Sequence, residues 1–176
     1  MAGIDPTRTS QPLHIAVLTV SDSRTPETDR SGDTLAARLT EAGHVLAARD
    51  LVHDDAATIA ARLRSWIDDG DVEVVLITGG TGVTGRDVTP EAVEQVSEKL
   101  IAGFGELFRM ISYGKIGTSA LQSRATAGVA GGTYIFALPG SPGACRDGWD
   151  EILVHQLDIR HRPCNFAELL PRLKER

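Results

Sequence analysis

The residues best suited to chemistry form a glycine-rich segment, residues 78–87, with the sequence Thr-Gly-Gly-Thr-Gly-Val-Thr-Gly-Arg-Asp. Gly80, Gly82 and Gly85 have the spacing of the dinucleotide-binding fingerprint, whose glycines let the backbone approach a pyrophosphate. That fingerprint normally ends the first strand of a domain and opens a helix directly. Here it follows the third predicted strand, and the next predicted helix starts only near Pro90. A nicotinamide-dependent enzyme is therefore a disfavoured alternative.

The same segment nearly matches a phosphate-binding P-loop between Gly80 and Gly85. Arg86 and Asp87 then stand where a P-loop has the Lys and the Ser or Thr that contact phosphate and Mg²⁺. An anion is still favoured, because bare backbone N–H groups near the start of a helix attract negative charge. Long loops without a role are scarce, so we predict an anion-binding loop rather than a simple turn.

Two carboxylates, Asp54 and Asp87, each follow a predicted strand and precede a predicted helix. A nucleotide-bound Mg²⁺ needs one or two carboxylates together with substrate phosphates, so this pair would suit a nucleotide metal. The alternative is that Asp54 only caps the following helix, and from spacing alone this is the stronger interpretation. It is weaker for Asp87, because Thr89 is already the candidate cap there.

A second candidate loop, residues 139–143, has the sequence Pro-Gly-Ser-Pro-Gly and lies between the last predicted strand and the last predicted helix. The amides of Gly140, Ser141 and Gly143 suit a phosphate or pterin cradle. The loop is not a nucleophile elbow, because Pro139 occupies the first glycine position of that motif. Since no His–Asp partner is evident either, a hydrolase triad is disfavoured.

The strands that must position these loops are visible as apolar runs. Residues 14–20 and 72–78 are continuous enough for strands buried on both faces, as in a parallel sheet, and residues 45–52 form a weaker strand. Residues 123–129 and 133–138 flank a Gly-Gly pair and predict one antiparallel hairpin.

Helical patterns alternate with these strands, which predicts an α/β fold with a mostly parallel sheet and helices on both faces. The predicted helices are one that follows a polar loop over 21–32 and stops at Gly43, one from a cap at Asp54 or Asp55 to Gly70, one opened by Thr89 and Pro90, and one over 144–160. Ligands of open α/β sheets bind beyond the carboxyl ends of the strands, where the loops at 21–23, 78–87 and 139–143 would converge.

Length and composition favour one domain over residues 13–176, after a flexible N-terminal tail over 1–12. The net charge of −6 comes without a basic stripe, so nucleic acid is not an expected partner. The apolar runs are much shorter than a membrane span. Two cysteines, Cys145 and Cys164, make no disulfide framework, and the expected location is the cytoplasm.

Seven motifs, in chain order, resemble the MoaB/MogA family of molybdenum cofactor biosynthesis proteins. They are TVSDSR at 19–24, TGGTG at 78–82, RDVTPEA at 86–92, GFGELFRM at 103–110, GTSALQSRA at 117–125, LPGSP at 138–142 and RPCNF at 162–166. The last is closest to the MoaB branch. Each motif is moderately specific, and their common order makes the resemblance strongly specific.

The resemblance implies a three-layer α/β/α sandwich, in which active members adenylylate molybdopterin with Mg·ATP and release pyrophosphate. It implies that Asp54 and Asp87 are the catalytic and Mg²⁺-holding aspartates, which reverses the cap interpretation of Asp54. On the nucleotide side it implies Ser21, Asp22, Ser31, Gly32, Thr78, Gly79, Gly80, Thr81 and Gly82. On the molybdopterin side it implies Ser123, Arg124, Pro139, Gly140, Ser141, Pro142 and Gly143.

Two functions are compatible with these residues. The first is a molybdopterin adenylyltransferase, in which positioning and charge stabilisation lower the barrier and Arg24, Arg30 or Arg86 offsets phosphate charge. The second is a non-catalytic molybdopterin-binding or carrier protein, which needs the same glycine loops and no metal. Other molybdenum cofactor biosynthesis proteins are possible partners of either.

Assembly is suggested by residues 104–111, where Leu107, Phe108, Met110 and Ile111 cover more than one helical face. Such a helix is usually buried, either in its own core or against another subunit. The resemblance implies trimers, with hexamers in the MoaB branch. We therefore predict a cyclic homotrimer, two of which associate into a homohexamer.

Overall fold

The computed structural model describes residues 2–175, and its central sheet has six strands in the order β3-β2-β4-β7-β6-β5. The strands are β2 (His14–Val20), β3 (Val45–Val52), β4 (Val74–Thr78), β5 (Lys99–Leu100), β6 (Thr126–Ala130) and β7 (Thr133–Leu138). β3, β2, β4 and β7 are parallel. The predicted antiparallel hairpin is β6–β7, and a short second antiparallel pairing joins β5 to β6. Gly131 and Gly132 turn the hairpin with φ of 58° and 89°, a region that favours glycine.

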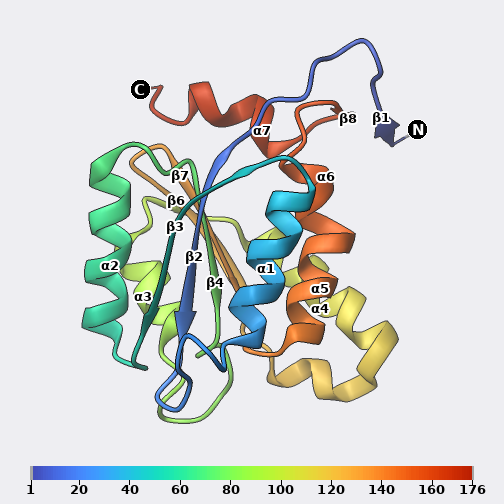
Figure 1. Ribbon diagram of the computed structural model, residues 1–176. Helices are drawn as coiled ribbons and strands as arrows, with labels where there is room; N and C mark the ends of the chain where they lie inside the picture. Colours follow the sequence, from blue (N-terminus) through green and yellow to red (C-terminus); the bar gives the residue numbers. More distant parts are fainter. Residues whose placement is uncertain (1, 176) are drawn as a thin grey trace.

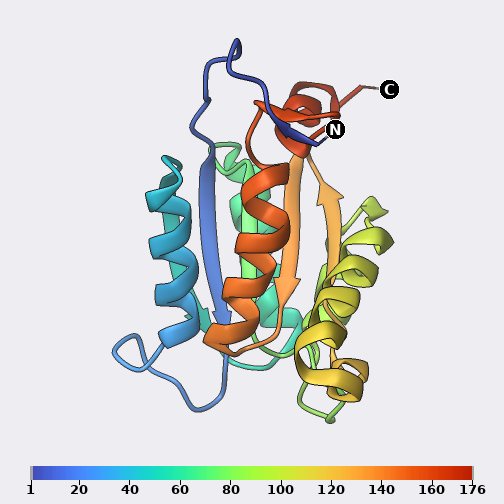
Figure 2. The same ribbon diagram turned by 90° about the vertical axis from the view of Figure 1, so that its right-hand side faces the viewer.

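Helices cover both faces of the sheet, so the predicted three-layer α/β/α fold is confirmed (Figures 1 and 2). α2 (Ala56–Asp69) and α3 (Thr89–Val96) lie on one face; α1 (Arg30–Glu41), α4 (Ala102–Ile116) and the C-terminal helical segment lie on the other. Successive residues of β2 alternate between the two layers: Ile15 and Val17 pack with the α1 side, and Ala16 and Leu18 with the α2 side. Burial of both faces explains the continuous apolar runs of the strands.

The ends of α1 and α2 largely follow the sequence signals. Gly43 and Gly70 come just after these helices with φ of 87° and 78°, as predicted for glycine stops. The loop predicted to extend to Gly32 ends earlier, because the Asp29 side chain accepts a hydrogen bond from the Gly32 amide at 2.9 Å and caps α1 at Arg30.

The single helix predicted over 144–160 is divided into three segments. They are α5 (Pro142–Gly148), the π-helical segment η2 (Trp149–Leu153) and α6 (Val154–Gln156). The helix starts two residues earlier than predicted because the Ser141 hydroxyl caps it, accepting from the Ala144 amide at 3.1 Å. The wider π turn coincides with full burial of Trp149 and Leu153 in the core.

The N-terminal segment, predicted to be a flexible tail, contacts the C-terminal part of the chain. β1 (Gly3–Ile4) pairs with β8 (His161–Arg162), and Arg8 forms an ion pair with Glu168 at 2.8 Å. The chain ends with α7 (Phe166–Leu169) and the 3-10 segment η3 (Leu170–Arg172). The two termini lie at the end of the sheet that is farther from the carboxyl ends of the parallel strands (Figure 1).

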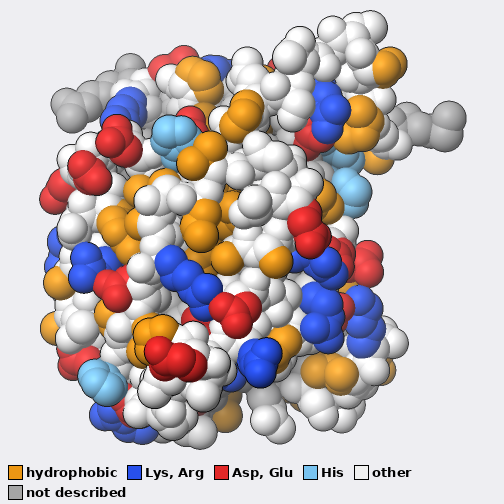
Figure 3. Space-filling view, in the orientation of Figure 1, with side chains coloured by type: hydrophobic (Ala, Val, Ile, Leu, Met, Phe, Trp, Pro, Cys, Tyr) orange, Lys and Arg blue, Asp and Glu red, His pale blue; other side chains and the backbone are white. Residues whose placement is uncertain are grey.

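The surface carries charges of both signs, which lie interspersed with hydrophobic side chains on the face shown in Figure 3. Within residues 2–175, every helix is too short or too polar to cross a membrane.

Candidate functional site

Two adjoining hollows lie at the carboxyl edge of the parallel strands. One, here called the loop hollow, has a volume of about 470 Å³ and is formed by the loops after β2, β3, β4 and β7. The other, the helix hollow, has a volume of about 310 Å³ and lies between α4, the 3-10 segment η1 (Gly117–Gln122) and the start of α5. Gln122 and Pro139 line both hollows, so the two adjoin at these residues.

The loop hollow gathers most of the predicted nucleotide residues, because the parallel strands deliver their loops to one edge of the sheet. Its predicted lining residues are Ser21, Asp22, Asp54, Gly79, Gly80, Thr81, Gly82, Asp87, Pro139 and Gly140. The structure also places Arg24 and Gln122 in this wall.

The glycine loop is held against the end of the sheet by a small set of backbone contacts. The Gly79 amide donates to the Leu138 carbonyl at 3.0 Å, and the Thr89 amide donates to the Gly80 carbonyl at 3.0 Å. The Thr89 hydroxyl donates to the Gly79 carbonyl at 2.8 Å, so it ties the loop instead of capping α3 as predicted. Among the described residues, the Gly80 and Thr81 amides donate to no acceptor, which leaves them available to an anion.

Asp54 is not the cap of α2. The Asp55 carboxylate fills that role, accepting from the Thr58 amide at 2.7 Å. Within residues 2–175 the Asp54 carboxylate has no side-chain hydrogen-bond partner, although its own amide donates to Asp22 at 3.1 Å. Burial, with the nearby charges of Asp22 and Asp87, raises the pKa of the Asp54 carboxyl. A cation would relieve this repulsion and supply a partner.

Asp87, in contrast, is a fixed anion. Its carboxylate accepts hydrogen bonds from the Thr84 hydroxyl at 2.6 Å and the Thr84 amide at 2.8 Å. These bonds, led by that of the hydroxyl, lower the pKa of the Asp87 carboxyl. Asp54 and Asp87 together offer the hard oxygen ligands that Mg²⁺ takes when substrate phosphates complete its shell. No group of three or more His, Cys, Asp or Glu side chains in the described chain forms an all-protein metal cage.

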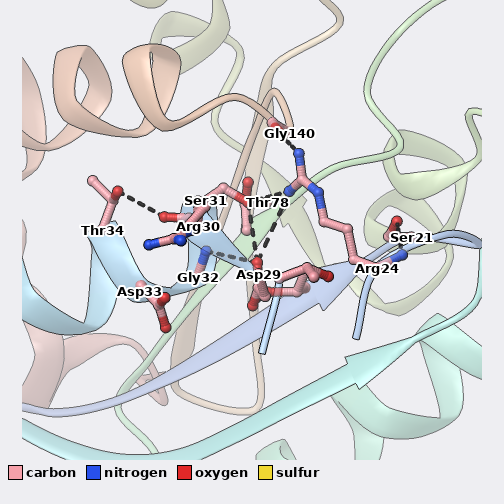
Figure 4. A network of polar contacts seen from close by, with 12 residues as sticks. Ser21, Arg24, Asp29, Arg30, Ser31, Gly32, Asp33, Thr34, Thr78 and Gly140 are labelled. Atoms are coloured by element: carbon pink, nitrogen blue, oxygen red, sulfur yellow. Dashed lines mark hydrogen bonds and ion pairs between the residues drawn. The ribbon is translucent and has the colours of Figure 1, made fainter. Parts of the chain in front are cut away.

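Arg24 links the two sides of the loop hollow (Figure 4). Its guanidinium donates to the Ser31 hydroxyl and to the Gly140 carbonyl. Behind it, the Asp29 carboxylate accepts from the Thr19 hydroxyl at 2.6 Å and lies 3.9 Å from the Arg24 guanidinium. Ser31 therefore holds Arg24 in place and does not itself line either hollow.

Asp29 is almost completely buried, and its environment keeps it ionised. Burial opposes the charge, but hydrogen bonds from Thr19, Gly32 and Arg49 outweigh that effect and lower the pKa of the Asp29 carboxyl. The predicted residue Gly32 thus contributes to this network from behind the wall of the hollow. A Cβ at Gly32 would lie 2.1 Å from an Asp29 oxygen, so no larger residue fits there.

Two residues predicted to bind the nucleotide, Thr78 and Ser21, use their hydroxyls to hydrogen-bond the backbone of the loops. The Thr78 hydroxyl is buried and donates to the Pro139 carbonyl at 3.2 Å. The Ser21 hydroxyl accepts from the amides of Ser23 and Arg24, both at 3.2 Å. Both hydroxyls therefore shape the turns that surround the loop hollow.

Asp22 lies at the mouth of the loop hollow and joins the loops after β2, β3 and β4. Its carboxylate accepts from Arg86 at 2.6 and 2.8 Å and from the Asp54 amide at 3.1 Å. The hydrogen bonds from Arg86 are the main reason that the pKa of the Asp22 carboxyl is lowered.

The helix hollow has walls from α4 that were not among the predicted site residues. Phe108, Ser112 and Lys115 line it, and the Lys115 ammonium pairs with Asp147 at 2.7 Å. The motif at 117–125 supplied the predicted pterin residues Ser123 and Arg124, whereas residues 104–111 were predicted only to form a core or assembly helix. A helix face that lines a hollow has the same periodicity as one that packs in a core. The predicted pterin residues found in this wall are Ser123, Pro139, Ser141 and Gly143.

Two predicted pterin residues line neither of these hollows. Pro142 occupies the first turn of α5. The Arg124 side chain turns to the glycine loop, where its guanidinium donates to the carbonyls of Gly82 and Asp87, both at 2.6 Å.

The geometry defines an α/β ligand-binding domain with a composite site. One part offers free amides, an arginine and two carboxylates, which suit phosphate groups and a divalent cation. The adjoining part offers a less polar hollow of a size that suits a ring system.

A family model described as "Probable molybdopterin binding domain" matches residues 16–159. The chain is 51% identical over 164 residues to "Molybdenum cofactor biosynthesis protein B" of Escherichia coli (strain K12), covering 93% of this chain and 95% of that protein. A crystal structure of molybdenum cofactor biosynthesis protein B superposes with a TM-score of 0.86 at 40% identity, covering 96% of this chain and 100% of the other. A "Molybdopterin biosynthesis enzyme MoaB" from Thermus thermophilus superposes with a TM-score of 0.72 at 34% identity, covering 80% and 89% respectively.

The chain therefore belongs to the molybdopterin-binding domain family. The predicted resemblance to the MoaB/MogA proteins is confirmed, and among the relatives the chain is similar to MoaB over nearly its whole length.

Proposed function

We propose that this protein acts in molybdenum cofactor biosynthesis by binding molybdopterin and adenylylating it with Mg·ATP. The observation that carries the proposal is that the loop hollow and the helix hollow adjoin, with Gln122 and Pro139 in the walls of both. A nucleotide in one and a pterin in the other would meet at that junction. The names of the relatives in molybdenum cofactor biosynthesis support the same substrate class.

In this arrangement the pterin ring occupies the helix hollow, with its terminal phosphate at the Pro139–Gly140 junction. A phosphate oxygen attacks the α-phosphorus of ATP, the bond to the β-phosphate oxygen breaks, and pyrophosphate leaves. The protein contributes position and charge rather than a covalent intermediate. The Gly80 and Thr81 amides would receive phosphate oxygens, and Arg24 would offset charge at the junction.

Asp54 and Asp87 would hold the magnesium ion of the nucleotide. The ion supplies charge neutralisation of the phosphates. Asp54, which has no side-chain donor among the described residues and a raised pKa, gains most from a cation, whereas Asp87 offers a carboxylate already fixed by Thr84.

A non-catalytic pterin carrier is the second candidate. The helix hollow is complete without the carboxylates of the loop hollow, so pterin binding alone needs neither Asp54 nor Asp87. The two functions differ in one respect that can be measured directly: only the first releases pyrophosphate.

For the assembly we propose a cyclic homotrimer, with two trimers forming a hexamer. The supporting feature is a patch of exposed apolar side chains on α4 and η1. Met110, Tyr113, Ile116 and Leu121 are 66%, 63%, 57% and 80% exposed. Patches of this kind commonly mark protein interfaces, and closed symmetry would cover one on every subunit.

The catalytic proposal is tested by incubating the protein with molybdopterin, ATP and Mg²⁺ and measuring pyrophosphate. The wild type should release it, and Asp87→Ala should not while retaining its circular dichroism spectrum. Asp71→Ala, which removes an exposed carboxylate at the opposite edge of the sheet, is the matched control and should behave as wild type. Unchanged turnover in Asp87→Ala would refute the role given to that carboxylate.

A further inference from the structure

We propose that Arg124 is a positioning residue that clamps the glycine loop and so fixes Asp87, instead of contacting the pterin. The structural part of this inference stands on the contacts of Arg124 alone. Its consequence for catalysis rests on the proposed adenylylation.

The clamp consists of contacts from one residue to both ends of a short loop. The Arg124 amide donates to the Thr81 carbonyl at 2.8 Å, and its Nε donates to the Gly82 carbonyl at 2.6 Å. Its Nη2 donates to the Asp87 carbonyl at 2.6 Å. The remaining nitrogen, Nη1, forms an ion pair with Glu91 on the first turns of α3. Every one of these acceptors belongs to residues 81–91, and none faces the helix hollow.

Arg124 itself has a firm support. It lies between η1 and β6, where Arg109 of α4 donates to the carbonyl of Ala125 at 3.2 Å. On the N-terminal side of Arg124, the Ser123 amide donates to the Ala120 carbonyl of η1 at 3.2 Å. Besides its own bond to Thr81, the backbone that carries the clamp thus has anchors in α4 and η1, which lie outside the loop that it holds.

The other side-chain tie of this loop, the ion pair of Arg86 with Asp22, ends on another exposed loop and not on a helix or strand. The bonds from Thr84 to the Asp87 carboxylate lie within the loop, so they set its internal shape and not its position relative to the sheet. Arg124 donates to the Gly82 carbonyl, which precedes the turn from Thr84 to Asp87, and to the Asp87 carbonyl, which ends it. An arginine suits the task because its planar fork directs several donors at fixed angles, whereas a lysine presents one compact charge.

The test is hydrogen–deuterium exchange of peptides covering residues 81–88 in the free protein. Arg124→Ala and Arg124→Lys should exchange at least about ten-fold faster there, by loss of the fork, with unchanged exchange in the central strands. Glu91→Gln keeps the carbonyl bonds and should remain within about two-fold of wild type. Arg172→Ala, which removes an exposed arginine near the C-terminus, is the control for loss of charge.

Two further readouts separate positioning from ligand binding. Molybdopterin affinity, measured by calorimetry, should be unchanged in Arg124→Lys. Its kcat for adenylylation should fall about 10–100-fold, as is typical when a support of a metal ligand is lost, with KM for the pterin unchanged. Recovery of most of this loss at raised Mg²⁺ concentration would support the link to Asp87.

Unchanged exchange over 81–88 in both Arg124 variants would overturn the clamp. Loss of molybdopterin affinity without faster exchange would overturn it in favour of a pterin contact. If the wild type itself forms no adenylylated product, the proposed function fails, and the exchange of the free protein still decides whether Arg124 clamps the loop.

Discussion

Replacing Gly80 by alanine should damage the site, whereas the same change at Gly85 should not. Gly80 has a φ of 64°, and a Cβ there would lie 2.4 Å from the Thr89 hydroxyl oxygen and 3.0 Å from an Asp54 oxygen. At Gly85 an added Cβ meets nothing within 4 Å, and its φ lies outside the left-handed region. The two glycines belong to the same loop, so each variant controls for the other.

The magnitude follows from two separate effects at Gly80. The left-handed backbone costs an alanine about 1–2 kcal/mol. Overpacking against a side chain fixed by a hydrogen bond costs about 1–3 kcal/mol more, and Thr89 is fixed in this way by the Gly79 carbonyl. Gly80→Ala should therefore lower the free energy of unfolding by about 2–5 kcal/mol. Gly85→Ala should leave it unchanged or raise it by about 0.4–1 kcal/mol, because the unfolded chain loses freedom.

The assay is urea denaturation of both variants, followed by calorimetry of Mg·ATP binding on the folded protein. Gly80→Ala should also lose nucleotide affinity, because the clash displaces Thr89 or Asp54. Equal stability and equal nucleotide affinity in the two variants would refute the geometry assigned to the loop. A large loss in Gly85→Ala alone would instead favour the dinucleotide fingerprint, which the position of the loop after the third strand disfavours.

Further predictions concern charge and assembly. The pKa of Asp54 is raised above its unfolded value, so its ionised form opposes folding at neutral pH. Asp54→Asn should therefore raise the melting temperature at pH 7, and this gain should vanish below about pH 3.9, where the carboxyl is protonated in both states. A lower melting temperature of the variant at pH 7 would contradict this. The pKa of Asp29 is lowered, so its ionised form stabilises the fold above the unfolded pKa, and this stabilisation is lost as the pH falls through the folded value. Asp29→Ala should cost about 1–3 kcal/mol in urea denaturation, because it removes the buried acceptor of the Thr19 hydroxyl and one of the two carboxylates that pair with Arg49. A cost below about 0.5 kcal/mol would argue against the network. In size exclusion coupled to light scattering, the wild type should run as a trimer or hexamer and Leu121→Asp as a monomer. A wild-type monomer would contradict the proposed assembly, and a wild-type trimer would contradict only the proposed pairing of two trimers.

The strands were predictable because burial on both faces leaves a signal in the sequence. β2, β3 and β7 have the predicted bounds, and β4 starts two residues later than predicted. Two-residue strands such as β1 and β8 leave no such signal, since periodicity needs several residues. The π segment within the last helix was not predictable either, because its buried residues also match an ordinary helix.

The sequence predicted which loops form the site, but it did not predict what each side chain does there. Spacing cannot decide which of the adjacent carboxylates Asp54 and Asp55 caps α2, and the structure assigns the cap to Asp55. The motif around Arg124 placed it in the site, but only the fold brings the carbonyls of Gly82 and Asp87, some forty residues away in sequence, to its guanidinium. Lys115 was missed because its partner Asp147 comes from a different helix.

Mass spectrometry of the pterin after a single turnover tests the central proposal most directly. Wild-type protein with molybdopterin, ATP and Mg²⁺ should yield molybdopterin carrying one adenylyl group, and Asp87→Ala should return only unmodified pterin while binding it as tightly as wild type. Unmodified pterin from the wild type, at saturating ATP and Mg²⁺ and with the pterin bound, would contradict adenylylation and leave the carrier function.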